Sequence, residues 1–167
     1  EERYEIIRAL GTVYQDISVI DLKAQTYMLI SGCGRSEQYQ GHIGPSEEFK
    51  GFVLNRIIAP SQHEEAGRFL NFSTAAARLR DKKFITCEFR GRNGAWYLVT
   101  LVAKTRDEGG EVTHVLVSAR NIDEQKTKEL EYQKDLEEAV AEARRANEAK
   151  TNFLRRMGHD IRTPLNG

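Results

Sequence analysis

The hydrophobic pattern divides the chain into two parts of different character. Eleven of the 13 glycines and two of the three prolines precede residue 111, whereas neither residue type occurs from 111 through 157. Because glycine and proline mark turns and loops, the first part is predicted to be compact and turn-rich. Residues 124–156 are rich in Glu, Lys, Arg, Ala and Gln, which favour helix, and they predict a long rod.

Four segments of the first part carry apolar residues at the spacing of short amphipathic helices. Ser46 and Ser73 stand at the start of two of these segments and are predicted N-caps, because a serine oxygen accepts from free backbone N–H groups there. The expected helices cover residues 3–14, 46–57, 63–72 and 73–79.

Five other segments are rich in residues that favour strands, or alternate apolar and polar residues with the period of two that is typical of strands. Residues 23–25 and Gly109-Gly110 are the expected turns between neighbouring strands, and the Gly- and Pro-containing residues 32–45 predict an irregular loop. The expected strands are residues 17–22, 26–30, 84–90, 96–104 and 112–120.

Asn93-Gly94 lies between two of these strands. This dipeptide favours the left-handed dihedral angles of a two-residue type I′ turn. With that turn, Phe89 is expected opposite Leu98, and Ile85 opposite Val102.

The order of elements predicts an α+β fold. A hairpin and a three-stranded meander form one five-stranded antiparallel sheet, with the helices on one face. We expect a compact domain with its flanking helix over residues 1–123, a helical linker over 124–150 and the start of a further domain over 151–167.

The charge balance limits the classes of partner. The chain has 167 residues, with 25 basic and 25 acidic side chains, and this zero net charge argues against a general nucleic-acid binder. No apolar run is long enough to span a bilayer and no signal peptide is visible, and the sequence is typical of an excised fragment. Cys33 and Cys87 form no metal or disulfide pattern, which indicates a reduced compartment, with Cys87 a buried thiol.

The rod carries a thin apolar seam in which steps of four and three residues alternate, as in a heptad repeat. The seam predicts a weak parallel coiled coil, and Asn147 within it can fix the register at some cost in stability. The alternative is a solvated single helix with ion pairs such as Glu124–Lys128. The seam residues are Leu136, Val140, Ala143, Asn147, Leu154, Met157 and Ile161.

Residues 12–123 resemble a PAS domain in the order and spacing of their elements. The strand entry Gly94-Ala95-Trp96-Tyr97 and the exit Asn121-Ile122-Asp123 carry the resemblance, although the exit differs at two positions from the usual Asp-Ile-Thr. The resemblance implies a sensory domain that passes a signal to the following helix.

Residues 152–167 look like the H-box of sensor histidine kinases, through His159-Asp160-Ile161-Arg162-Thr163-Pro164-Leu165-Asn166. The helical period puts His159 about 140° from Leu154, which turns it away from the seam, as a phosphoacceptor requires. The family implies that His159 attacks the γ-phosphorus of ATP and that Asp160 assists. It also implies that Thr163 serves the reverse reaction. Gly158 stands where serine is more usual, and Pro164 is an expected hinge.

The sequence therefore predicts the sensory and phosphoacceptor part of a two-component kinase, a homodimer that passes phosphate to a response-regulator receiver domain. ATP and Mg²⁺ are implied for a kinase domain that these residues do not contain, so the chain alone is expected to be inactive. The flavin signature is absent and His63, the candidate haem ligand, is better explained as a surface helix residue, so neither cofactor is supported. A small-molecule ligand stays open. A cytoplasmic location is expected, with a membrane anchor possible in a longer protein. The alternatives are a non-catalytic dimeric ligand-binding or interaction module and a coiled-coil scaffold.

Overall fold

The computed structural model describes residues 16–32 and 34–165, so the helix predicted at residues 3–14 and the thiol of Cys33 lie outside it. The chain divides into two compact units, one that ends at Asp123 and one that begins at Glu124.

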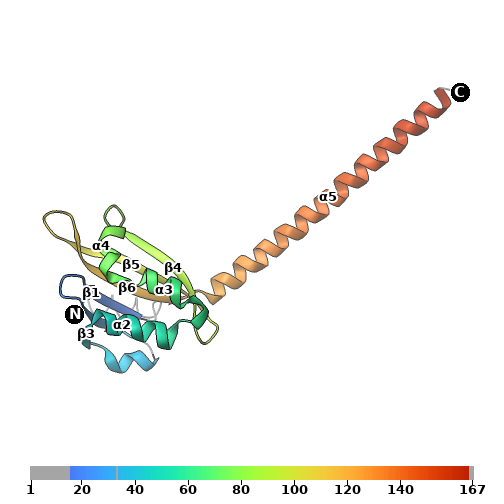
Figure 1. Cartoon of the computed structure of the whole chain (residues 1–167). Coiled ribbons are helices and arrows are strands. Elements are labelled where there is room, and N and C mark those ends of the chain that lie inside the picture. Colours follow the sequence, from blue (N-terminus) through green and yellow to red (C-terminus); the bar gives the residue numbers. More distant parts are fainter. Residues whose placement is uncertain (1–15, 33, 166–167) are drawn as a thin grey trace, which may run out of the picture. The chain divides into compact units, whose positions relative to one another are not determined.

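The first unit contains an antiparallel sheet (Figure 1). Its strands pair in the order β3-β2-β1-β6-β5-β4, so the β1–β2 hairpin and the β4–β5–β6 meander meet through β1 and β6. This confirms the predicted antiparallel sheet and its hairpin and meander. The strands are β1 (Asp16–Asp21), β2 (Thr26–Ser31), β3 (Ile43–Pro45), β4 (Phe84–Arg90), β5 (Trp96–Arg106) and β6 (Val112–Asn121).

The predicted number of strands is wrong, because the sheet has six strands and not five. The additional strand, β3, pairs with β2 and places Gly44 opposite Tyr27. A Cβ atom on Gly44 would lie 2.9 Å from the Tyr27 ring, so the approach of the two strands requires glycine. Of the glycines that suggested an irregular loop, Gly44 is thus part of an edge strand that ends at Pro45, where a missing N–H is tolerated.

Short helices occupy the predicted segments, but their caps differ from the prediction. Pro45 precedes α2 in an extended conformation, and the Ser46 hydroxyl donates to the Gln25 side chain at 3.4 Å. Asn71, not Ser73, caps the turn before α4, with its side-chain oxygen accepting the Ser73 N–H at 3.2 Å. The helices are η1 (Gly34–Tyr39), α2 (Ser46–Phe52), the π-helical η2 (Val53–Ile57), η3 (Pro60–Gln62), α3 (His63–Phe69), η4 (Phe72–Thr74) and α4 (Ala75–Arg78).

The predicted register of β4 and β5 is wrong by one residue. Phe89 lies opposite Tyr97, not Leu98, and Ile85 lies opposite Leu101, not Val102. The loop has three residues, Arg92, Asn93 and Gly94. The Gly91 N–H donates to the Ala95 carbonyl, and the Gly94 N–H donates to the Gly91 carbonyl. Within this loop only Gly94 has a positive φ, of 82°. This combination is a type I turn followed by a glycine bulge, which Asn-Gly fits as well as it fits type I′.

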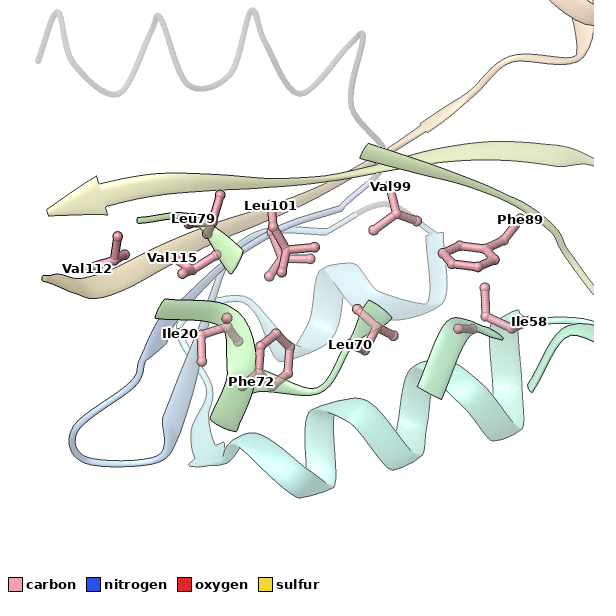
Figure 2. Packing of buried hydrophobic residues seen from close by; sticks show 13 residues of the cluster. Ile20, Ile58, Leu70, Phe72, Leu79, Phe89, Val99, Leu101, Val112 and Val115 are labelled. Atoms are coloured by element: carbon pink, nitrogen blue, oxygen red, sulfur yellow. The ribbon is translucent and has the colours of Figure 1, made fainter. Parts of the chain in front are cut away.

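The core lies between one face of the sheet and the short helices (Figure 2). Phe89 and Leu101 of the sheet and Leu70 and Phe72 of the helical segment are fully buried there. The shift in register places Phe89, Val99 and Leu101 on the same face, whereas the predicted register separated them. Burial of an apolar side chain of this size stabilises the fold by roughly 1.5–3 kcal/mol.

The second unit is formed by α5 (Asp123–Leu165), which has 43 residues (Figure 1). This confirms the predicted long helix and the ion pair of Glu124 with Lys128, whose charged atoms lie 2.7 Å apart. Within residues 16–32 and 34–165 no helix has the length and apolar character needed to cross a bilayer.

Candidate functional site

The last turns of α5 carry the predicted site residues. The side chain of His159 is 79 % exposed, and its neighbour Asp160 is 81 % exposed. The heptad steps place Leu154, Met157 and Ile161 on another side of the helix, so a partner packed on that seam would leave His159 accessible.

Asp160 lies beside the imidazole of His159. Its Oδ1 atom is 3.6 Å from Nδ1 of the ring, which is longer than a hydrogen bond but close enough for one to form after a small rotation. An Nδ1–H directed at this carboxylate leaves the lone pair on Nε2, so the pair favours the tautomer in which Nε2 is the nucleophile.

Thr163 is brought to the same turn, but its hydroxyl is engaged with the backbone. It donates to the carbonyl oxygen of His159 at 2.9 Å. Pro164 has no N–H to donate to the carbonyl of Asp160, one turn earlier, yet α5 continues to Leu165. The predicted hinge at Pro164 stays a prediction.

Gly158, next to His159, has open space around it. A Cβ atom built on Gly158 would meet nothing within 4 Å. Within the single chain the glycine is therefore not required by packing, and the serine usual at this position would fit.

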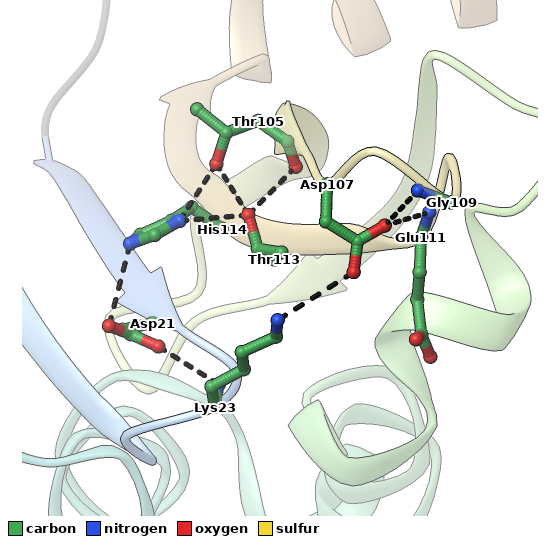
Figure 3. Close-up of polar contacts among 8 residues, drawn as sticks. All are labelled: Asp21, Lys23, Thr105, Asp107, Gly109, Glu111, Thr113 and His114. Atoms are coloured by element: carbon green, nitrogen blue, oxygen red, sulfur yellow. Dashed lines mark hydrogen bonds and ion pairs between the residues drawn. The ribbon is translucent and has the colours of Figure 1, made fainter.

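Two histidines of the first unit have polar partners. Nε2 of His63 lies 3.2 Å from the carbonyl oxygen of Ile58. Nδ1 of His114 is 2.7 Å from the Thr105 hydroxyl, and its Nε2 is 3.4 Å from Asp21 (Figure 3). In the described part of the chain, no three His, Cys, Asp or Glu side chains are grouped so that they could hold a metal ion.

Cys87 is half-buried in β4, and its thiol lies 3.9 Å from the Glu65 carboxylate. Burial raises the pKa of the Cys87 thiol, and the charge of Glu65 raises it further, so the reactive thiolate is disfavoured.

Ser18 is a polar feature of the core that the sequence pattern did not indicate. Its side chain lies on the same face of β1 as that of Ile20, is 1 % exposed and has no hydrogen-bond partner among the described residues. A serine in a strand is unremarkable in a sequence, so only the packing around it identifies an unpaired buried hydroxyl.

Side chains of the motif Asn121-Ile122-Asp123 fix the backbone where β6 ends and α5 begins. The Asp123 carboxylate accepts the Trp96 N–H at 2.6 Å, and Asn121 accepts the Asp123 N–H at 2.8 Å. The Ile122 N–H donates to the Trp96 carbonyl. The first residue of α5 is thus fixed to the start of β5, although Asn121 and Asp123 replace the usual residues.

No protein-family model matches the chain. Over 29 residues the sequence is 66 % identical to the Sensory/regulatory protein RpfC of Xanthomonas campestris pv. campestris, in each of two strains. This segment is 17 % of the chain and 4 % of that protein, so the chain matches only a small part of these curated relatives.

Three solved structures are similar to the chain. The first is the N-terminal domain of a diguanylate cyclase with PAS/PAC sensor from Marinobacter aquaeolei, at 16 % identity and TM-score 0.43, which covers 66 % of this chain and 97 % of that one. The second is a sensory box histidine kinase/response regulator from Burkholderia thailandensis, at 15 % identity and TM-score 0.46, with coverages of 81 % and 96 %. The third, from Haloarcula marismortui, bears the name of a light and redox sensing histidine kinase, at 17 % identity and TM-score 0.41, with coverages of 73 % and 99 %.

The chain is thus similar to PAS-containing sensors and sensor histidine kinases, as the sequence predicted. The predicted α+β class, with one antiparallel sheet, helices on one face and a long following helix, is confirmed by the topology described above.

Proposed function

We propose that this chain is the sensory and phosphoacceptor part of a two-component sensor histidine kinase. The PAS-like unit receives a signal, a dimeric α5 relays it, and His159 accepts phosphate from ATP and passes it to an aspartate of a response regulator. The observation that supports this most directly is an exposed imidazole with a carboxylate 3.6 Å away, on the side of a long helix that its apolar seam does not use.

The phosphorylation step uses the two neighbouring side chains. The lone pair on Nε2 of His159 forms a bond to the γ-phosphorus of ATP, while the bond from that phosphorus to the bridging oxygen breaks and ADP leaves. Asp160 holds Nδ1–H in the productive tautomer and takes that proton as the ring acquires positive charge. A kinase domain supplies the ATP and Mg²⁺ in this scheme.

The return path is transfer of the phosphoryl group from Nε2 to a carboxylate oxygen of a receiver domain. Thr163, one turn beyond His159, serves the reverse reaction by orienting water toward the acyl phosphate of the receiver. For that role its hydroxyl has to leave the His159 carbonyl, to which it donates at 2.9 Å.

The dimer forms through the seam of α5. Leu136, Val140 and Leu154 are exposed in the single chain, and a second copy in parallel register covers them. The signal from the PAS-like unit selects between two packings of this helix pair. A ligand shifts such an equilibrium only through a difference in its affinity for the two states.

The experiment is to incubate the full-length protein with Mg²⁺ and radiolabelled ATP and to locate acid-labile phosphate. We expect labelling of the wild type, no labelling of His159→Gln, and wild-type labelling of the control His42→Gln, which removes an imidazole from the first unit. Asp160→Asn should slow labelling at least about 100-fold if the carboxylate acts as general base. Undiminished labelling of His159→Gln would refute the proposal.

A second candidate function is a dimeric ligand-binding module in which His159 is not used. The unpaired hydroxyl of Ser18 favours it, because a buried unpaired polar group costs about 1–3 kcal/mol and a bound small molecule would satisfy it. The absence of phosphate on His159, together with a small molecule that co-purifies with the wild type but not with Ser18→Ala, would support this candidate over the first.

A further inference from the structure

Charge is distributed unevenly along α5. Residues 124–148 contain eight acidic and five basic side chains, whereas residues 149–165 contain four basic side chains and one acidic side chain, Asp160. The segment around His159 is therefore positive, while the rest of the helix is negative. The basic side chains of this segment are Lys150, Arg155, Arg156 and Arg162.

Arg155 and Arg156 lie on the same side of α5 as His159. At about 100° per residue they are about 40° and 60° from it, one on each side, and about one turn nearer the amino terminus. Both side chains are exposed. Arg155 donates to the Asn152 side-chain oxygen at 3.1 Å, and neither guanidinium has another hydrogen bond or ion pair among the described residues.

Arg155 and Arg156 differ from Arg162 in the direction in which their side chains lean along the helix. Every Cα–Cβ bond of a helix tilts toward the amino terminus, so Arg162 and Thr163 lean toward His159. Arg155 and Arg156 lean away from it for the same reason. They are therefore placed to contact a body that covers the turn before His159, and not the phosphoryl group on the imidazole.

We infer that Arg155 and Arg156 are a docking pair for the acidic face of the receiver domain that takes phosphate from His159. This inference rests on the proposed function. Mg²⁺ that assists transfer of a phosphoryl group is held in proteins by one or two carboxylates together with phosphate oxygens and waters, so carboxylates are expected around the acceptor aspartate. The face around it is therefore anionic and complementary to the two guanidinium groups. Complementary charge of this kind raises association rates by 10-fold to 1,000-fold and weakens with salt.

The chain offers a matched control for this pair. Arg144 and Arg145 are also adjacent arginines, and a separation of 11 residues turns them only about 20° from Arg155 and Arg156 while it moves them about 16 Å along the axis. Reversal of either pair changes the net charge equally. A general effect of charge would therefore slow transfer in both variants, whereas loss of a docking contact would slow it only when Arg155 and Arg156 are reversed.

The test measures phosphoryl transfer from phosphorylated full-length protein. The probe is a purified receiver domain, chosen as the one from the same organism that takes phosphate fastest from the wild type. At low salt we expect transfer per labelled His159 to slow at least about 10-fold in Arg155→Glu/Arg156→Glu and less than about 3-fold in Arg144→Glu/Arg145→Glu. The deficit of the first variant should shrink as salt is raised.

Each other outcome has a distinct meaning. Equal slowing in both variants, or none in either, overturns the docking inference and leaves the proposed function intact. Loss of labelling of His159 itself in Arg155→Glu/Arg156→Glu also overturns it, because the arginines would then serve the phosphorylation step. If the wild type acquires no phosphate on His159, the proposed function fails first.

Discussion

At the residue scale, one arginine holds three backbone segments together. The guanidinium of Arg106 donates to the carbonyl oxygens of Leu79, Arg80, Lys82 and Gly110 at 2.9–3.0 Å. These bonds fix the segment after α4 and the β5–β6 turn to the end of β5. A planar group with five donors suits this geometry better than the single ammonium of lysine.

Arg106→Met is expected to lower the free energy of unfolding by about 1–3 kcal/mol, because it removes the side-chain donor that four carbonyl oxygens share. Arg106→Lys should recover part of the loss. The control is Arg68→Met, which removes an exposed ion pair with Glu64 and should cost less than about 0.5 kcal/mol. Urea unfolding of the three variants measures the difference, and equal effects at the two arginines would contradict the assignment.

Asp21 gives a prediction on pH. Its carboxylate accepts the backbone N–H groups of Ala24 at 2.8 Å and Lys23 at 2.9 Å. The Ala24 hydrogen bond lowers the pKa of Asp21, partial burial opposes this, and the Lys23 N–H and the charges of His114 and Lys23 lower it further. A depressed carboxyl pKa contributes stability above the unfolded value of about 3.9, and this contribution is lost as pH falls through the folded value.

Asp21→Asn should therefore be destabilising at pH 5, and its difference from the wild type should shrink as the pH is lowered to about 2. Urea midpoints of both proteins across this range measure the effect. A difference that is constant or grows toward low pH would show that the charge of Asp21 does not act in this way.

At the scale of elements, the β4–β5 hairpin shows where sequence prediction reaches its limit. The strand boundaries of β4 follow from alternation, and its observed range matches the predicted one. The register of β4 and β5 does not follow from alternation, because Asn93-Gly94 fits both a two-residue and a three-residue loop. A slip by one residue pairs the side chains of one strand with those on the other face of its neighbour. Long-range packing of Phe89 against the helical segment decides between the loops.

The long helix could be predicted because its signal is local and repeated over many residues, whereas β3 could not because its strand character comes from pairing with β2. For the candidate site, the exposure of His159 follows from the helical period alone. The hydrogen bond from Thr163 to the His159 carbonyl depends on a rotamer, and the unpaired hydroxyl of Ser18 depends on neighbours distant in sequence.

Gly94→Ala should destabilise the protein by about 1 kcal/mol or more, since alanine is strained at a φ of 82°. The matched control is Gly51→Ala in α2, where a Cβ meets nothing within 4 Å and the backbone is helical. That change should stabilise the protein by up to about 1 kcal/mol. Thermal unfolding of the two variants should thus shift in opposite directions, and a loss of stability only at Gly51 would contradict the turn assignment.

At the scale of the whole molecule, the proposed dimer depends on the seam of α5. Steps of four and three residues place Val140, Asn147 and Leu154 at equivalent a positions of successive heptads, with Leu136, Ala143 and Met157 at d positions. Alanine in the middle and Asn147 between Val140 and Leu154 make the seam weak. The proposed pair of helices is therefore expected to be weak enough to change its packing.

Asn147 provides the sharpest test of this seam, because the same helix contains a second asparagine, Asn152, at an f position that faces away from it. Asn147→Leu should stabilise the dimer by roughly 2 kcal/mol per chain through burial of the leucine, and should loosen the register that paired asparagines fix. Asn152→Leu should leave the dimer unchanged, since its side chain stays in solvent. Sedimentation and the concentration dependence of thermal unfolding measure both effects. If the two variants behave alike, or if unfolding does not depend on concentration, α5 does not pair through this seam and the proposed route from the PAS-like unit to His159 fails with it.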